Sequence, residues 1–216
     1  MKAAEISNVL IALIVLASLI TAPALFDKPA PTIPESFLFA FIILLIAICS
    51  KKAIAFALES DVEHQLWTIE RWGLHKQDQF KKPLPLGIIL PIIVSLFSFG
   101  STRLMTLLTY ETTPKKTRAV RAFGHTKKYT YVSMTDWHNA LIGAAGTLSV
   151  LLVALIAYIL PWNAEPLARL ATFYAFSNLL PFSKLDGTQI FFGSRVLYVT
   201  LATITIIFTG YAIALQ

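Results

Sequence analysis

The stretch that decides how this chain folds is Asn178-Leu179-Leu180-Pro181-Phe182-Ser183-Lys184-Leu185-Asp186-Gly187. It joins two apolar runs, 167–180 and 190–215, so that Asp186 places an acid between hydrophobic segments. Pro181 is expected to end a helix, and Gly187 permits a tight turn. An ionisable residue in such a place is costly, and it indicates a functional site. The alternative is an interfacial loop in which Asp186 caps the following helix.

Composition predicts a membrane protein. Hydrophobic residues make up 56% of the 216 positions and charged residues only 14%, whereas an average soluble protein has about 25% charged residues. The hydrophobic residues also occur in long blocks. We therefore expect an all-α, polytopic membrane protein with about 5–6 transmembrane or re-entrant helices. It is expected to be a single membrane domain, 1–216, with a first span and loop (1–35), a core (36–200) and a last span (190–215).

The net charge of +6 does not predict a nucleic-acid partner. The basic residues cluster between hydrophobic blocks, as the positive-inside rule predicts for cytoplasmic loops, and they are not interleaved with aromatic residues on a soluble domain. We expect a location in the cell membrane, with the lipid bilayer as one partner and with the basic loops in the cytoplasm. The single cysteine, Cys49, excludes an intramolecular disulfide and a zinc finger.

Several apolar runs are candidate spans. Residues 6–25 are long enough to cross a bilayer and are expected to form a retained first helix, with a cleaved signal peptide as the alternative. Residues 37–49 are too short alone, so either Lys51 and Lys52 snorkel and the helix continues to residue 58, or a second helix begins there. The segment 84–108 either spans or forms a re-entrant hairpin, with Pro91 or Gly87 near its bend. The run Gly143-Ala144-Ala145-Gly146 is expected to allow a close helix contact.

The polar stretch after residue 58 carries most of the remaining candidate chemistry. Apolar residues at positions 58, 62, 66 and 69 predict one face of a helix that ends near Gly73. Asp61, Glu63 and His64 lie within two turns of this expected helix. The simplest interpretation is an amphipathic helix that leaves the membrane with its charges in water.

The residues Asn178-Leu-Leu-Pro181 followed by Leu185-Asp186-Gly187 resemble the NxxPxxxLDG segment of the site-2 protease family of intramembrane zinc metalloproteases. The resemblance covers roughly residues 50–200 and is weaker outside this segment. It implies that Asp186 is a zinc ligand and that Asn178 lies close to the path of a transmembrane protein substrate.

The family's HExxH motif is degenerate here. Aligning His64 with its second histidine puts Ser60 at the first histidine and Asp61 at the glutamate. The resemblance then implies His64 and Asp186 as metal ligands, with Asp61 or Glu63 as general base. One of three zinc ligands is missing under this alignment, so the expected cofactor is either zinc or none.

Three functions follow as hypotheses. The first is a metallopeptidase homologue that hydrolyses peptide bonds in transmembrane substrates. The second is an inactive pseudoprotease that binds membrane helices in the same groove. The third is a small proton- or cation-coupled transporter that uses Asp186, Asp61 and His64. With the N-terminus inside and a re-entrant 84–99, Asp186 is expected on the same side as Asp61 and His64.

Overall fold

The structure is a computed structural model that describes residues 3–71, 79–100, 104–115, 134–159 and 164–214. These residues form seven α-helices: α1 Ala3–Thr21, α2 Ile33–Ala57, α3 Leu86–Phe97, α5 Asp136–Ile159, α6 Glu165–Leu179, α7 Asp186–Gly193 and α8 Arg195–Ala214. A 3₁₀ turn, η1 Ala22–Phe26, follows α1. Four short strands complete the described part: β1 Ser60–Leu66, β2 Ile69–Arg71, β3 Gln79–Leu84 and β4 Leu108–Pro114.

Four of these helices are long and apolar enough to cross a membrane: Ala4–Phe26 with its 3₁₀ extension, Ile33–Ala57, Asp136–Ile159 and Arg195–Ala214. Their outer faces expose large hydrophobic side chains, such as Leu10 and Ile14 on α1 and Val199 and Ile206 on α8. An apolar surface of this kind is consistent with a membrane protein, because water would penalise it. The prediction of an all-α chain is confirmed in part: the described residues are mostly helical, but they also form four short strands that were not predicted.

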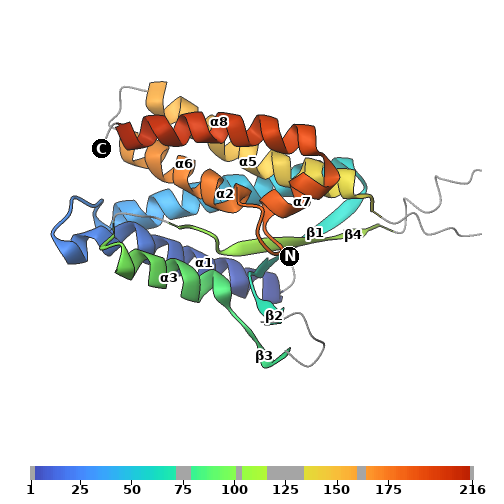
Figure 1. Cartoon of the computed structure of the whole chain (residues 1–216), viewed down its shortest axis with the longest axis horizontal. Coiled ribbons are helices and arrows are strands. Elements are labelled where there is room, and N and C mark those ends of the chain that lie inside the picture. Colours follow the sequence, from blue (N-terminus) through green and yellow to red (C-terminus); the bar gives the residue numbers. More distant parts are fainter. Residues whose placement is uncertain (1–2, 72–78, 101–103, 116–133, 160–163, 215–216) are drawn as a thin grey trace, which may run out of the picture.

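The helices form a bundle (Figure 1) in which successive contacts link α3, α1, α2, α5, α6 and α8. The antiparallel pair β1–β4 lies at the end of the bundle where α2 ends and α7 begins. A second, small pair, β2–β3, leads from β1 toward α3. The largest hydrophobic cluster fills the space between α1, α2, α5 and α6 and includes Leu16, Ile43 and Leu170.

Helix α2 continues without a break through both lysines. Its start is fixed by a capping box in which the Thr32 N–H donates to the Glu35 carboxylate at 2.8 Å. Of the two alternatives for this run, the continuous helix is therefore correct. The lysines differ, however, because Lys51 is buried and Lys52 is partly exposed. Lys51 thus does not snorkel to the surface.

The predicted helix over residues 58–73 is wrong. Residues 60–66 form β1, which pairs in register with β4, so that His64 faces Tyr110 and Val62 faces Thr112. Burial alternates along β1, with Ser60, Val62 and His64 inside. The spacing of the apolar residues fits the two-residue repeat of a strand as well as the 3.6-residue repeat of a helix. Pairing with β4, more than forty residues away, selects the strand. Gly73 lies outside the described residues.

The segment after β3 leaves the sheet and returns to it. The Trp67 C=O accepts a hydrogen bond from the Gly87 N–H at 2.8 Å, and the Trp67 N–H donates to the Leu107 C=O at 3.0 Å. Between these points α3 runs along α1, and Gly100 packs against Pro23 at the far end of α1. Both ends of the excursion therefore lie at the same end of the bundle, as a re-entrant hairpin requires. A methyl group on Gly87 would lie 2.5 Å from the Leu107 oxygen, so this crossing needs glycine.

The stretch from residue 178 to 187 forms a tight connection between α6 and α7. Gly187 lies so close to α6 that a Cβ there would overlap the Leu179 carbonyl. Leu185 occupies the cap position of α7, and Asp186 is the first helical residue. The interpretation of Asp186 as a helix cap is therefore wrong. The predicted last span also divides, because the extended backbone of Ser194 separates α7 from α8.

The glycines of α5 make room for side chains rather than for a neighbouring backbone. A Cβ on Gly146 would lie 2.4 Å from Cε of Lys51, and one on Gly143 would lie 2.7 Å from the Tyr110 hydroxyl oxygen. The expected close contact is present, since α5 packs against α2. What these two positions accommodate, however, is one lysine and one tyrosine.

We expect Gly146→Ala to destabilise the protein by about 1–3 kcal/mol, because the added methyl overpacks the Lys51 stem, whose end is held by Asp186. Thermal unfolding in detergent, followed by intrinsic fluorescence, measures the effect. Gly210→Ala is the matched control, since a Cβ at that helical glycine meets nothing within 4 Å. An equal loss of stability in both variants would contradict this account of Gly146.

Candidate functional site

Two adjacent lysines near the end of α2 meet two buried acids. The Lys51 Nζ lies 2.5 Å from Oδ2 of Asp186, and both side chains are at most 5% exposed. The Lys52 Nζ lies 2.6 Å from Oε1 of Glu5. Successive residues of a helix point about 100° apart, so the two lysines serve acids on different sides of α2. The charges of these two pairs balance within the described part of the bundle.

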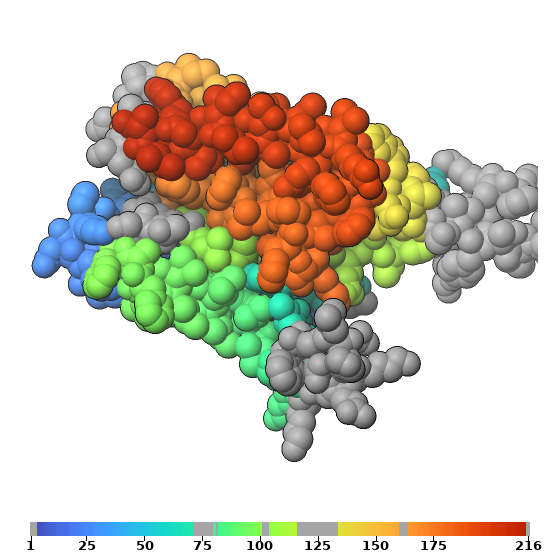
Figure 2. Space-filling view, viewed as in Figure 1, coloured from blue at the N-terminus to red at the C-terminus, as the bar shows by residue number. Residues whose placement is uncertain are grey.

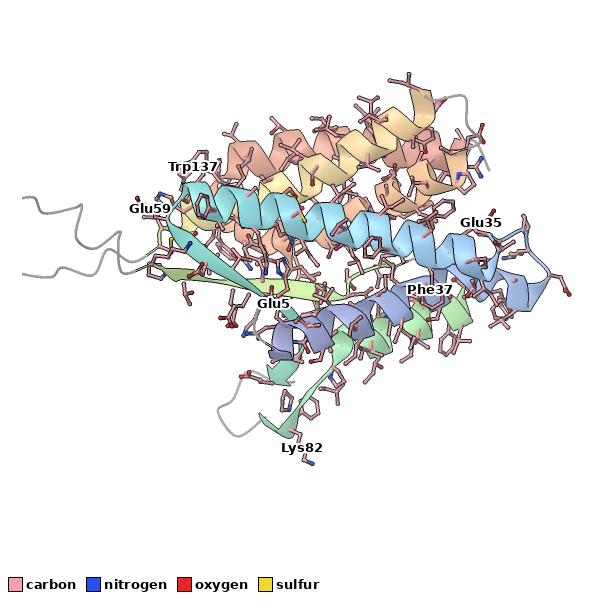
Figure 3. The ribbon with its side chains drawn as sticks, turned by 180° about the vertical axis from the view of Figure 1, so that it is seen from behind. Glu5, Glu35, Phe37, Glu59, Lys82 and Trp137 are labelled. Atoms are coloured by element: carbon pink, nitrogen blue, oxygen red, sulfur yellow. The ribbon has the colours of Figure 1, made fainter. Side chains whose placement is uncertain are left out.

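Glu5 connects this helix to the strand pair. It lies in the first turn of α1, and its side chain points toward β1 and the end of α2 (Figure 3). Its Oε1 lies 3.2 Å from Nδ1 of His64 and accepts the backbone N–H of His64 at 3.4 Å. A carboxylate can only accept, so the His64 proton belongs on Nδ1 and leaves Nε2 as an acceptor.

Tyr110 joins the two halves of the cluster. It lies directly opposite His64 in the β1–β4 ladder, and its ring centroid is 4.7 Å from the Lys51 Nζ. An ammonium over an aromatic face is attracted by the ring quadrupole. The Tyr110 hydroxyl donates to the Asn139 C=O at 2.6 Å, which fixes the ring in place. The described cluster is therefore a continuous array from Lys52 through Glu5, His64, Tyr110 and Lys51 to Asp186.

Burial shifts the titration of the groups outside the long helices. Burial, with a further contribution from the positive charge of Lys51, lowers the pKa of His64 to about 4, so His64 is neutral at pH 7. Burial raises the pKa of the Asp186 carboxyl, and the Lys51 ammonium opposes this rise. Burial also raises the pKa of Tyr110, which stays a neutral phenol.

Two buried acceptors of this cluster have no hydrogen-bond partner among the described residues. They are Nε2 of His64 and Oδ1 of Asp186. Each unpartnered polar atom in a buried place raises the free energy of the folded state by about 1–3 kcal/mol. The positive charge of Lys51 lowers the pKa of both residues that carry these atoms. The cluster therefore has acceptor capacity that its own donors do not use.

The residues predicted as catalytic line a pocket with Glu5 and Lys52, and Asp186 is not part of that pocket. Asp61 and Glu63 alternate with His64 along β1 and so lie on the opposite face of the strand. Asp61 is exposed and lies 3.2 Å from Lys115, and Glu63 lies opposite Glu111 in the ladder. Ser60, at the aligned position of the first histidine, is buried and donates its hydroxyl to the Ala55 C=O at 3.0 Å.

The remaining two predicted residues, Asn178 and Asp186, flank the α6–α7 connection. Asn178 is buried on α6 and donates its amide to the Tyr174 C=O at 3.0 Å. The connection itself packs on the turn after β1, where the Trp67 indole N–H donates to Ser183 Oγ at 3.2 Å and its ring meets Phe182 edge-on. In Figure 2 this connection (orange) reaches onto the segment that follows β1 (teal).

Zinc, which the family resemblance implies, does not fit these residues. A zinc site needs three or four N, O or S donors around one point. The described part of the chain contains no group of three or more His, Cys, Asp or Glu side chains placed to hold a metal ion. Asp186 is bound by an ammonium group, and its charge would repel a divalent cation at the same place.

Sequence reasoning missed four members of the cluster: Glu5, Lys51, Lys52 and Tyr110. Glu5 had a usable signal, because an acid at the start of an apolar run marks a site by the same argument as Asp186. Both lysines are visible in the sequence, but snorkelling predicts their ammonium groups at the surface. No local signal identifies Tyr110, since its place depends on the β1–β4 register.

Comparison with known proteins adds no family. No family model, curated protein or solved structure matches this chain. The resemblance to the site-2 protease family therefore remains a hypothesis that depends on the residues from 178 to 187.

The neutral His64 predicts a stability that depends on pH. The folded pKa of about 4 lies below the ordinary value of 6.5, so the unfolded chain binds more protons between these values and the protein loses stability as the pH falls from 6.5 to 4. The loss attributable to His64 is about 3 kcal/mol across this window. The charged groups near the ring are Glu5, which raises the pKa of His64, and Lys51 and Lys52, which lower it. The net shift of the His64 pKa is downward.

The measurement is the thermal midpoint between pH 7.5 and 4.5 for the wild type and for His64→Gln. The difference between the two proteins isolates the histidine from other titrating groups. It should grow toward pH 7.5, where the wild type gains most from its neutral ring. Parallel curves would contradict a buried neutral His64.

The Lys51–Asp186 pair predicts strong coupling. Lys51→Met or Asp186→Asn alone leaves one charge buried without a counter-charge, and we expect each to cost about 3–5 kcal/mol. The double variant removes both charges and should recover much of the loss. A double-mutant cycle of unfolding free energies tests this, and additive losses would contradict a buried ion pair.

Proposed function

We propose that this chain is a membrane-embedded, non-catalytic relative of the site-2 proteases that binds an extended or locally unwound segment of another membrane protein. The observation that carries the proposal is the position of Lys51. The acid that the resemblance assigns to a metal is instead paired with a lysine of the same chain, at 2.5 Å. A site with its own cation retains charge balance without zinc, whereas hydrolysis of this kind would need a metal ion at the carboxylate that Lys51 occupies.

The placement of the predicted bases supports the same conclusion. Asp61 and Glu63 lie on the outer face of β1, whereas Asp186 is buried at the start of α7 with Lys51. A general base must reach the attacking water to within about 3 Å. The peptidase hypothesis would need a different arrangement of β1. It therefore ranks second to binding without cleavage.

The outer edge of β4 supports an extended partner. The odd positions of β1 bond across the ladder, as the Lys115 N–H to Glu59 C=O and Trp67 N–H to Leu107 C=O bonds indicate at its ends. The even positions of β4 therefore direct their backbone groups away from β1. The Tyr110 carbonyl is one of these, and it accepts the side-chain amide of Gln189 at 3.1 Å.

Gln189 thus makes the bond that an added strand would make. A side-chain amide has the same donor as a peptide group, and it comes from α7, one turn after Asp186. An extended segment bound along β4 would replace Gln189 and would lie beside the α6–α7 connection. Strand addition provides affinity through backbone bonds and needs no catalytic group.

Proton- or cation-coupled transport is the remaining candidate function. Glu5 and Lys52 line an open pocket of about 600 Å³ together with Asp61, Glu63 and Lys115. The Glu5 carboxylate contacts Nδ1 of His64, so Glu5 links this pocket to the buried cluster. Proton flux in sealed vesicles that is abolished by Glu5→Gln would favour this candidate over binding.

The binding proposal is tested with a single-span peptide that carries ¹³C-labelled carbonyls and a helix-breaking Asn-Pro pair in one half. We expect the labelled infrared band to move to strand frequencies when the peptide joins the reconstituted protein. The matched control is an all-Leu span without the Asn-Pro pair, which should remain helical. Gln189→Ala should tighten binding a few-fold, because a competing hydrogen bond of about 1 kcal/mol is removed.

The same sample decides between binding and cleavage. Mass spectrometry of the peptide after incubation with and without added zinc should find it intact. Cleavage that requires zinc and is lost in Asp186→Asn would establish the peptidase. An unchanged infrared band, with an intact peptide, would contradict strand addition.

A further inference from the structure

The Lys51 ammonium lies in a site whose walls are fixed by contacts that do not involve Lys51. Tyr110 is held by its hydrogen bond to the Asn139 C=O and by the space at Gly143. Asp186 is held by the start of α7 and by the close packing of Gly187 on Leu179. The stem of Lys51 lies against Gly146, the residue that leaves room for it. The surroundings of the ammonium are therefore formed by residues of β4, α5, α6 and α7.

We propose that this place is a buried binding site for a primary alkylammonium ion and that the chain's own Lys51 is its resident ligand. The proposal does not depend on partner binding at β4, because it concerns only the described buried cluster. In this proposal Lys51 supplies the positive charge beside Asp186 that a metal ion would supply in the zinc centre implied by the family resemblance. The cation is covalently attached, so it cannot dissociate or be chelated.

The chemistry of the walls selects an ammonium ion. Oδ2 of Asp186 accepts from Lys51, and Oδ1 is a further acceptor without a partner in the described residues. An ammonium group has three donors, and the face of Tyr110, at 4.7 Å, suits an organic cation.

A divalent metal suits these walls less well. Magnesium and calcium take six or more oxygen ligands, and zinc takes three or four donors. Around the ammonium the site offers one buried carboxylate and an aromatic face. A single positive charge also matches the single negative charge of Asp186.

The experiment empties the site and refills it. Lys51→Ala removes the atoms from Cγ to Nζ, which together correspond to the propylammonium ion. We expect the thermal midpoint of Lys51→Ala to fall, and then to rise saturably by about 5 °C as propylammonium chloride is added. Sodium chloride at equal ionic strength and 1-propanol should give no such rise.

Two control variants cannot use the amine. Lys51→Met fills the stem space, and Lys51→Ala with Asp186→Asn removes the counter-charge. Neither should respond to propylammonium. The proposal is overturned if Lys51→Ala does not respond, if both controls respond equally, or if zinc stabilises Lys51→Ala more than the amine does.

Purification provides a second measurement for the case in which Lys51→Ala unfolds in detergent. The variant is then extracted with either propylammonium or sodium chloride in every buffer. Recovery of folded protein only with the amine supports the proposal, and failure with both contradicts it.

Discussion

The burial of Asp186 is the constraint on which the rest of this fold depends. A carboxylate this deep in an apolar bundle is stable only beside a cation, and Lys51 supplies one from a helix far away in the sequence. The Lys51 ammonium can reach Asp186 only if α5 has a glycine at position 146. In addition, α7 must begin directly against α6, which requires Gly187. The close approach of α2, α5 and α7 is therefore tied to one ion pair.

The second pair, between Glu5 and Lys52, extends the same constraint to the strand pair. Glu5 accepts both from Lys52 and from His64, so α1, α2 and β1 meet at a single carboxylate. Two consecutive lysines thus organise two different sides of α2: Lys51 pairs with Asp186 of α7, and Lys52 pairs with Glu5 of α1, which also contacts His64 of β1. The register of β1 with β4 then places Tyr110 over Lys51 and links the two sides.

The sequence predicted the long apolar helices and the importance of Asp186 because both signals are local. Run length identifies a span, and an acid between two such runs is unusual wherever it lies. It did not predict β1, since Val62 and Leu66 fit either period and the partner strand lies beyond α3. It also misplaced Lys51, because the local alternative of snorkelling is cheaper than burial unless a distant acid is present. The sequence therefore identifies the acid of the site, Asp186, but not its cation, because the position of Lys51 depends on how α2 and α7 pack in the bundle.

The order in which the two ion pairs become possible has a consequence for biosynthesis. Glu5 and Lys52 belong to the first two helices, so they can neutralise each other as soon as α2 has left the ribosome. Lys51 must wait for Asp186, and at typical rates of chain elongation the wait is on the order of ten seconds. During that interval the nascent chain carries an uncompensated ammonium beside its first helical hairpin. We expect such a charge to keep the end of α2 at the aqueous boundary until Asp186 has been synthesised.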